Sequence, residues 1–297
     1  MLTIFSIPKA FRGHIGTIQR NAITSWSRLR PHVEIVLFGR DEGTSEMAEE
    51  LQLRHISDVT VNEFGAPLLD DLFGKAEAVA SHPHMCYVNA DIILRDDFLR
   101  AMEIVLREMP KSLAVSKRIN VDICESLDFT GDWEASVRRR VAETGADGHY
   151  TSIDIFTFPK GMYPKVPAFA IGRLWYDHWL IKAVRDQNLP VIDLSLVSPL
   201  LHQNHDYNHV PGGADQVWRG KEAERNHQLS GGASNAYTML DVTHELMPDG
   251  RIRRVRYRKE LQLAKTAMWE VFVNRTARVR HALGLRKRRA TSESRAS

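Results

Sequence analysis

An acidic residue interrupts one of the most apolar stretches of the chain. Residues 87–94 read Tyr-Val-Asn-Ala-Asp-Ile-Ile-Leu, so Asn89 and Asp91 lie inside a run that otherwise predicts a buried strand. An unpaired buried carboxylate is unfavourable, and hard cations such as Mg²⁺ and Mn²⁺ prefer oxygen ligands together with substrate phosphates. The segment predicts either a metal–phosphate site at the end of a strand or a solvated aspartate that opens a turn.

A second group of polar residues lies between positions 202 and 209, where three histidines and one aspartate occur within eight residues. Imidazole is a common metal ligand, so we expect one histidine, foremost His202 or His205, to complete the coordination of a cation held by Asp91. No cysteine accompanies the histidines, which disfavours a separate zinc site. The alternative is a polar loop whose histidines bond to the backbone.

Asp177 lies near the predicted start of a helix, after a Gly172-Arg173 turn and between two tryptophans. Trp175 and Trp179 are four residues apart, so a helix places them on one face. Such rings stack on a sugar or a nucleobase, although core packing is the simpler explanation for the tryptophans themselves. An acid in this position is a candidate general base, and the helix dipole opposes that role because it lowers basicity.

Two further segments place charged residues beside apolar strands. Arg118 is a candidate phosphate ligand, and Asp122 is a candidate partner of a sugar hydroxyl. Asp154 repeats the pattern of a carboxylate that leads into an apolar strand. Surface or buried ion pairs explain each of these three residues equally well.

The elements that must position these side chains alternate between short strands and helices. Strands are predicted over residues 2–7, 33–38, 54–56, 85–94, 113–117, 150–158 and 191–194. Helices are predicted over residues 14–29, 44–51, 67–80, 96–109 and 174–186. This alternation indicates an α/β fold with a Rossmann-like, mostly parallel central sheet flanked by helices. Ligands of such sheets bind at the carboxyl ends of the strands, where loops 8–11, 39–42 and 89–91 fall.

The composition is that of an ordinary globular protein, with 43% hydrophobic and 26% charged residues in 297. The two cysteines form no disulfide framework, which favours a reduced, intracellular setting. Pro8 breaks the N-terminal apolar stretch too early for a signal peptide, and no run approaches the roughly 18 apolar residues of a membrane span. The absence of GxGxxG, GxxxxGK[ST] and GxSxG motifs disfavours dehydrogenases, P-loop NTPases and serine hydrolases.

Basic residues gather at the C-terminal end. Residues 244–297 contain 15 Lys and Arg against 5 Asp and Glu, whereas the rest of the chain contains 25 against 32. Apolar residues at helical spacing within 258–285 predict one or two amphipathic helices, followed by a disordered end at 291–297. Such a segment fits an anionic membrane surface, and the alternatives are a helix packed on the body or a solubilising end. We expect no nucleic-acid partner, because no recognised reading module accompanies the charge.

Taken together, these segments resemble the GT-A-fold glycosyltransferases, and in particular the family-2-like bacterial group. The resemblance covers roughly residues 1–210 and rests on loop 8–11, segment 19–26, turn 39–42, the triplet 89–91 and segments 172–177 and 202–209. It implies a GT-A (nucleotide-diphospho-sugar transferase) catalytic domain over residues 1–243. Residues 244–297 are then a basic helical extension.

The resemblance also implies the position of a metal. In GT-A enzymes a DxD motif after a central strand holds Mn²⁺ or Mg²⁺ against the diphosphate of a sugar nucleotide. The matching triplet here is Asn89-Ala90-Asp91, so an amide replaces the first acid. Asp91 is thereby implied as the metal ligand, with His202 or His205 completing the shell and Asn89 contacting the donor.

Further roles follow from the same resemblance. Asp177 corresponds to the base of inverting members, and Arg173 or Arg118 shares the charge of the departing diphosphate. Residues implied on the acceptor side are Asp154, Trp175 and Trp179. Asp122 is assigned to the donor sugar, and the nucleotide pocket is implied at the first two strand ends, where it comprises Pro8, Phe11, Arg20, Asp41 and Glu42.

The expected function is metal-dependent transfer of a sugar from a nucleotide-diphosphate sugar to an acceptor hydroxyl. The acceptor is a glycan, a lipid-linked sugar or a small molecule, and the expected location is cytoplasmic, with the basic tail as a peripheral membrane contact. Retaining chemistry stays open. One alternative is a metal-dependent phosphoesterase or nucleotidyltransferase centred on Asp91 and the histidines. Another is a non-catalytic nucleotide-binding scaffold, which the missing first acid of the DxD motif favours.

Overall fold

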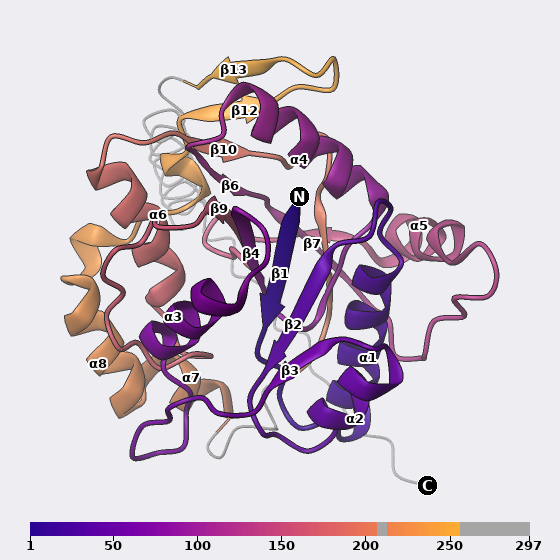
Figure 1. Cartoon of the computed structure of the whole chain (residues 1–297), viewed down its shortest axis with the longest axis horizontal. Coiled ribbons are helices and arrows are strands. Elements are labelled where there is room, and N and C mark those ends of the chain that lie inside the picture. The colour runs from indigo at the N-terminus through magenta and orange to yellow at the C-terminus, as the bar shows by residue number, and fades with distance from the viewer. Residues whose placement is uncertain (207–212, 256–297) are drawn as a thin grey trace, which may run out of the picture. The chain divides into compact units, whose positions relative to one another are not determined.

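The computed structural model describes residues 1–206 and 213–255, which form an α/β fold with two sheets (Figure 1). Among these residues the larger sheet has nine strands, in the spatial order β13 (Ile252–Arg254), β12 (His244–Leu246), β10 (Val191–Asp193), β6 (Leu113–Val115), β9 (Ile155–Pro159), β4 (His84–Val88), β1 (Leu2–Ser6), β2 (Glu34–Phe38) and β3 (Arg54–Ile56). Strands β9 and β13 run antiparallel to their neighbours, and the other pairs are parallel. The mostly parallel sheet predicted from the alternating pattern is therefore confirmed.

Helices cover both faces of this sheet (Figure 1). One face carries α1 (Gly13–Ser27), α2 (Thr44–Glu50) and α4 (Asp96–Glu108), and the other carries α3 (Leu69–Val79) and α6 (Tyr176–Asp186). Strand β1 supplies both cores, because successive side chains point to opposite faces. Ile4 packs into the core that contains Trp26 of α1, whereas Phe5 lies 5.3 Å from the ring of Phe73 of α3.

A smaller sheet lies beyond the end of β4. Its order is β5 (Ile92–Ile93), β11 (Leu200–Gln203), β7 (Arg118–Val121) and β8 (Ala146–Asp147), and α5 (Trp133–Thr144) packs on it through Val137. The prediction of one strand over residues 85–94 is wrong here. The chain turns at 89–91, where the backbone N–H of Asn89 donates to the carbonyl of Asp154 and that of Ile92 donates to the carbonyl of Asn89. The triplet Asn89-Ala90-Asp91 thus connects the larger sheet to the smaller one.

The remaining elements follow β11. Helices α7 (Gly213–Arg219) and α8 (Lys221–Ser230) lie between residues 194 and 258, where the sequence pattern predicts no helix. Two short 3₁₀ helices follow, η1 (Ala233–Asn235) and η2 (Met239–Asp241). None of the helices in residues 1–206 and 213–255 is both long and apolar enough to cross a membrane.

The compact unit continues beyond residue 243. Strand β12 pairs in parallel with β10, and β13 adds an antiparallel partner, so the unit extends from Met1 to Val255. The predicted amphipathic helices at 258–285 and the predicted disordered end at 291–297 lie outside the described residues.

Candidate functional site

Asp91 and two histidines meet just beyond the carboxyl end of β4. The Oδ2 atom of Asp91 lies 3.1 Å from Nε2 of His205 and 3.7 Å from Nε2 of His202. One candidate ligand atom from each residue lies within 4.8 Å of the other two. Antiparallel pairing of β11 with β5 sets His202 opposite Ile92, the residue after Asp91. Two segments more than a hundred residues apart in sequence are thereby brought to one point.

The donor set of this cluster fits a divalent cation. Asp91 Oδ1 and His202 Nδ1 are buried, and no described residue hydrogen-bonds to either atom. A buried carboxylate oxygen without a donor is unfavourable, and a cation removes that penalty. Imidazole suits Mn²⁺ and the later transition metals better than it suits Mg²⁺, which prefers oxygen ligands throughout.

The ionisation states of the three residues also bear on cation binding. Burial by itself would raise the pKa of Asp91, but His202, His205 and Lys9 together hold that pKa well below its ordinary range. Burial lowers the pKa of His202, which favours the neutral imidazole that binds metals. Burial also disfavours the charged form of His205, yet its bond to Asp91 outweighs this and the pKa of His205 is raised. A cation at His205 therefore competes with a proton.

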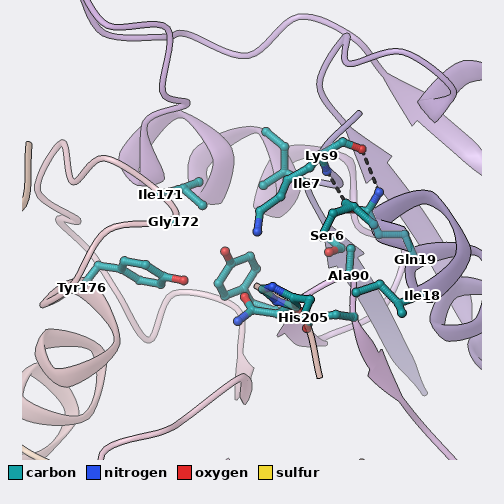
Figure 2. A pocket seen from close by; sticks show the side chains of 14 residues that line it. Ser6, Ile7, Lys9, Ile18, Gln19, Ala90, Ile171, Gly172, Tyr176 and His205 are labelled. Atoms are coloured by element: carbon teal, nitrogen blue, oxygen red, sulfur yellow. Dashed lines mark hydrogen bonds and ion pairs between the residues drawn. The ribbon is translucent and has the colours of Figure 1, made fainter. Parts of the chain in front are cut away.

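Two cavities adjoin the cluster, and a third, larger cavity shares lining residues with both. The first has a volume of about 90 Å³ and lies at the ends of β1 and β4, and Tyr87 and Asp91 contribute to its wall. Figure 2 shows Lys9, Tyr176 and His205 around this cavity. The second adjoining cavity, of about 140 Å³, has Asp177 in its wall together with the metal cluster. The larger cavity, of about 490 Å³, extends along residues 7–15 and the loop 64–67. Lys9 and Gly172 line all three cavities.

Two of the five residues predicted for the nucleotide pocket, Pro8 and Asp41, line the 490 Å³ cavity. Burial raises the pKa of Asp41. This cavity lies at the carboxyl ends of β1 and β2, as expected for a ligand of an open α/β sheet.

The other three predicted pocket residues, Phe11, Arg20 and Glu42, are not among the residues that line the cavities. Arg20 pairs with Glu50 at 2.8 Å, and its guanidinium carbon lies 5.7 Å from the centre of the Phe11 ring. Glu42 pairs with Arg12, and its carbonyl accepts the backbone N–H of Phe11 at 2.8 Å. The contacts of Glu42 join the loop after β1 to the turn after β2, whereas the Arg20–Glu50 pair joins α1 to α2.

Asp177 lies in the first turn of α6 and faces the 140 Å³ cavity. Gly172 and Trp175, with φ angles of 76° and 91°, turn the chain into this helix. Burial raises the pKa of Asp177, and repulsion from Asp154 raises it further. The charge and the backbone N–H of the neighbouring His178 lower this pKa, but by less, so the net shift is upward. Desolvation thus overcomes the helix-start effect that argued against a basic carboxylate at this position.

Arg118 and Arg173, which are predicted to share the charge of the departing diphosphate, each form an ion pair with a carboxylate. Arg118 Nη1 lies 3.0 Å from Asp154 Oδ2, and both residues line the 140 Å³ cavity. Arg173 lines two cavities, and its guanidinium lies 2.6 Å from Oε2 of Glu222 on α8. Each arginine therefore contributes a paired charge to the cavity walls.

Three other predicted residues lie away from the cavities. Trp179 packs 5.6 Å from the ring of Phe169, the ring of Trp175 lies 4.4 Å from that of His227, and Asp122 accepts a hydrogen bond from Asn204 at 2.7 Å.

Several residues that line the cavities were not predicted from the sequence, and Trp218 and Lys9 are two of them. Trp218 of α7 is 47% exposed and lines the 140 Å³ cavity, and its helix lies where the sequence pattern predicts none. Lys9 belongs to the polar loop 8–11 that the pattern identified. Nothing in the sequence distinguishes Lys9 from its neighbours in that loop.

Fold and site together define an α/β protein with a candidate metal centre where its parallel strands end. No family model and no curated protein matches the chain. Among solved structures it is similar to Mycobacterium tuberculosis glucosyl-3-phosphoglycerate synthase, with 13% identity, 80% of each chain covered and a TM-score of 0.47.

Two further structures are similar to it. Staphylococcus aureus TarS in complex with UDP-GlcNAc is 13% identical, with 70% of this chain and 60% of that chain covered and a TM-score of 0.49. A mannosyltransferase from Pyrobaculum calidifontis in complex with GDP-Man and Mn²⁺ is 12% identical, with 68% and 56% covered and a TM-score of 0.43. Similarity at this level of identity concerns the fold and says nothing about the ligands that this chain binds.

Proposed function

We propose that the chain is a GT-A-type glycosyltransferase of the family-2-like group. It transfers a sugar from a nucleotide-diphosphate sugar, bound with a divalent cation, to an acceptor hydroxyl. The observation that carries the proposal is the convergence of Asp91, His202 and His205 at the walls of the 90 Å³ and 140 Å³ cavities, beyond the carboxyl ends of parallel strands. A cation with few protein ligands commonly takes substrate phosphates as its remaining ligands.

The donor nucleotide is assigned to the 490 Å³ cavity. Its volume falls within the range of about 300–1,000 Å³ typical of small-molecule sites. Its wall combines apolar residues such as Pro8 and Ile171 with polar ones such as Asp41. This mixture suits a nucleoside, which presents a flat ring together with sugar hydroxyls.

The acceptor is assigned to the 140 Å³ cavity, with Asp177 as the base. The raised pKa of Asp177 makes its carboxylate a better proton acceptor, and the exposed ring of Trp218 offers a flat surface for a sugar. Asp177 takes the proton of the attacking hydroxyl, which corresponds to an inverting transfer. A cation held by Asp91, His202 and His205 would supply Lewis-acid stabilisation of the departing diphosphate.

The test is turnover of UDP- and GDP-sugars with Mn²⁺ or Mg²⁺ in the presence of glycan, lipid-linked and small-molecule acceptors. We expect sugar transfer by the wild-type protein, loss of transfer in Asp91→Ala, and full transfer in the control Asp58→Ala, whose side chain is 80% exposed. Phosphoester cleavage without transfer would point to a phosphoesterase. Tight metal-dependent nucleotide binding without turnover would point to a scaffold.

A further inference from the structure

Lys9 carries an uncompensated charge beside the metal cluster. The three arginines that line the cavities, Arg12, Arg118 and Arg173, each pair with a carboxylate. No described residue forms an ion pair or hydrogen bond with the ammonium group of Lys9, although this residue is partly buried and lines all three cavities. Figure 2 shows its side chain extending into the cavity that His205 and Tyr176 also face.

The backbone of Lys9 is held in place by a buried side chain. Gln19 of α1 is 2% exposed; its Oε1 accepts the N–H of Lys9 at 2.7 Å, and its Nε2 donates to the Lys9 carbonyl at 2.8 Å (Figure 2). This pair of bonds fixes the loop after β1 in the way a neighbouring strand would. The lysine is consequently placed by the fold and does not depend on a flexible loop.

The electrostatic surroundings of Lys9 are those of a ligand site. Burial lowers the pKa of Lys9 and Arg173 lowers it further, while Asp91 opposes both. A partly desolvated cation without a bonded counter-ion is unfavourable, and an anionic ligand removes this penalty. A divalent cation at Asp91 would repel the same ammonium group, because like charges at short range interact strongly where water is scarce.

We infer that Lys9 and the Asp91–His202–His205 cluster form the two ends of one diphosphate site. A diphosphate between them bonds to both the ammonium group and the cation, and its bond to Lys9 orients its free oxygens toward the cluster. Because this orientation outweighs the direct repulsion between Lys9 and the cation, the two ligands bind with positive coupling that depends on Lys9. The contribution of Lys9 to metal affinity therefore changes sign, from repulsive without diphosphate to favourable with it. This inference rests on the proposed function only for the assumption that the diphosphate belongs to a sugar nucleotide. The two-ended site itself needs only a diphosphate and a divalent cation.

Calorimetry of the full chain tests this inference with inorganic diphosphate, UDP and Mn²⁺ as probes. In Lys9→Met we expect Mn²⁺ alone to bind as tightly as in the wild type or more tightly. With saturating diphosphate we expect Mn²⁺ to bind about tenfold more weakly than in the wild type, since a charge-assisted bond contributes roughly that much. By reciprocity, Mn²⁺ should then strengthen diphosphate binding less in the variant than in the wild type.

Two further variants separate charge from shape. Lys9→Arg keeps the charge and should keep most of the coupling, whereas Lys165→Met removes an exposed lysine from a different cavity and should change nothing. An equal loss of Mn²⁺ affinity in Lys9→Met with and without diphosphate would overturn the inference, because it would indicate a structural role. Unchanged diphosphate binding in Lys9→Met would overturn it as well.

The outcome is distinguishable from a failure of the proposed function. Lys9-dependent coupling of Mn²⁺ and diphosphate in a protein that turns over no sugar nucleotide would uphold the two-ended site and overturn the glycosyltransferase proposal. Sugar transfer without such coupling would uphold the enzyme and overturn the role of Lys9.

Discussion

The side-chain amide of Asn89 donates a hydrogen bond to Oδ1 of Asp154 at 2.8 Å, and its backbone N–H donates to the Asp154 carbonyl at 3.0 Å. Asn89 occupies the position where a DxD motif has its first acid. Asp154 is already paired with Arg118, so a carboxylate at position 89 would face another carboxylate with no proton to share. The amide therefore fits its neighbour, and its presence is not a sign of a decayed metal site.

We predict that Asn89→Asp destabilises the protein without strengthening metal binding. Loss of the bond and repulsion between two carboxylates should lower the free energy of unfolding by about 1–3 kcal/mol. Repulsion raises the pKa of the pair in the folded state, so the destabilisation should be largest near neutral pH and should shrink as the pH falls through that raised pKa. Denaturant unfolding at several pH values measures it.

The exchange variant is the control for this prediction. Asn89→Asp combined with Asp154→Asn restores one carboxylate and one amide, and it should recover part of the lost stability. An Asn89→Asp protein as stable as the wild type, with tighter Mn²⁺ binding, would show that the position is free to act as a metal ligand.

The pH dependence of turnover should report Asp177. Burial raises the pKa of this carboxyl above the ordinary value of about 3.9. A base must be ionised, so turnover should increase as the pH rises through the raised pKa and level off above it. In Asp177→Asn the rate of turnover should fall about 10²–10⁴-fold, and the increase of turnover with pH in the acidic range should disappear.

Asp186→Asn lies on the same helix and serves as the matched control. It should leave both the rate and the pH profile of the wild type unchanged. A full rate and an unchanged acidic limb in Asp177→Asn would assign the base to another group.

Metal preference should follow the two imidazoles. We expect the wild type to bind Mn²⁺ more tightly than Mg²⁺, because nitrogen ligands suit Mn²⁺ better. His205→Asp replaces one nitrogen ligand by a carboxylate and should move the preference toward Mg²⁺. Competition of Mg²⁺ against Mn²⁺, followed by the paramagnetic resonance of free Mn²⁺, measures the ratio, and an identical ratio in both proteins would argue against coordination by His205.

Acid sensitivity of the fold should depend in part on Glu34. Its carboxylate accepts bonds from Thr3 Oγ1 at 2.5 Å and from the backbone N–H and the hydroxyl of Ser81 at 2.8 Å each. Burial would raise the pKa of Glu34, but these bonds outweigh it and the pKa is lowered. The resulting stability is present above the ordinary glutamate pKa and is lost as the pH falls through the lowered one.

Glu34→Gln should therefore be less stable near neutral pH and lose less stability on acidification than the wild type. Urea unfolding between neutral and acidic pH gives the slope, and Glu143→Gln, an exposed residue of α5, is the control. Equal slopes in Glu34→Gln and the wild type would remove Glu34 from the acid response.

The sequence predicts the sheet and its flanking helices because apolar strands and amphipathic helices alternate with clear periods. It does not predict the break at 89–91, since apolar residues continue across it and the turn depends on a backbone partner at Asp154. Residues Asp91, His202 and His205 stand out by type alone. Lys9 does not, because its placement depends on Gln19, and a bond between a side chain and the backbone ten residues away leaves no pattern.

The central claim is a metal–diphosphate site on Asp91, His202 and His205. The most direct measurement is a calorimetric titration of Mn²⁺ into the full chain with UDP present, for the wild type, Asp91→Ala and Asp58→Ala. We predict binding in the wild type and in Asp58→Ala, and its loss in Asp91→Ala. Mn²⁺ binding that is equally tight in Asp91→Ala, or UDP binding that is tight and indifferent to Mn²⁺, would contradict the claim.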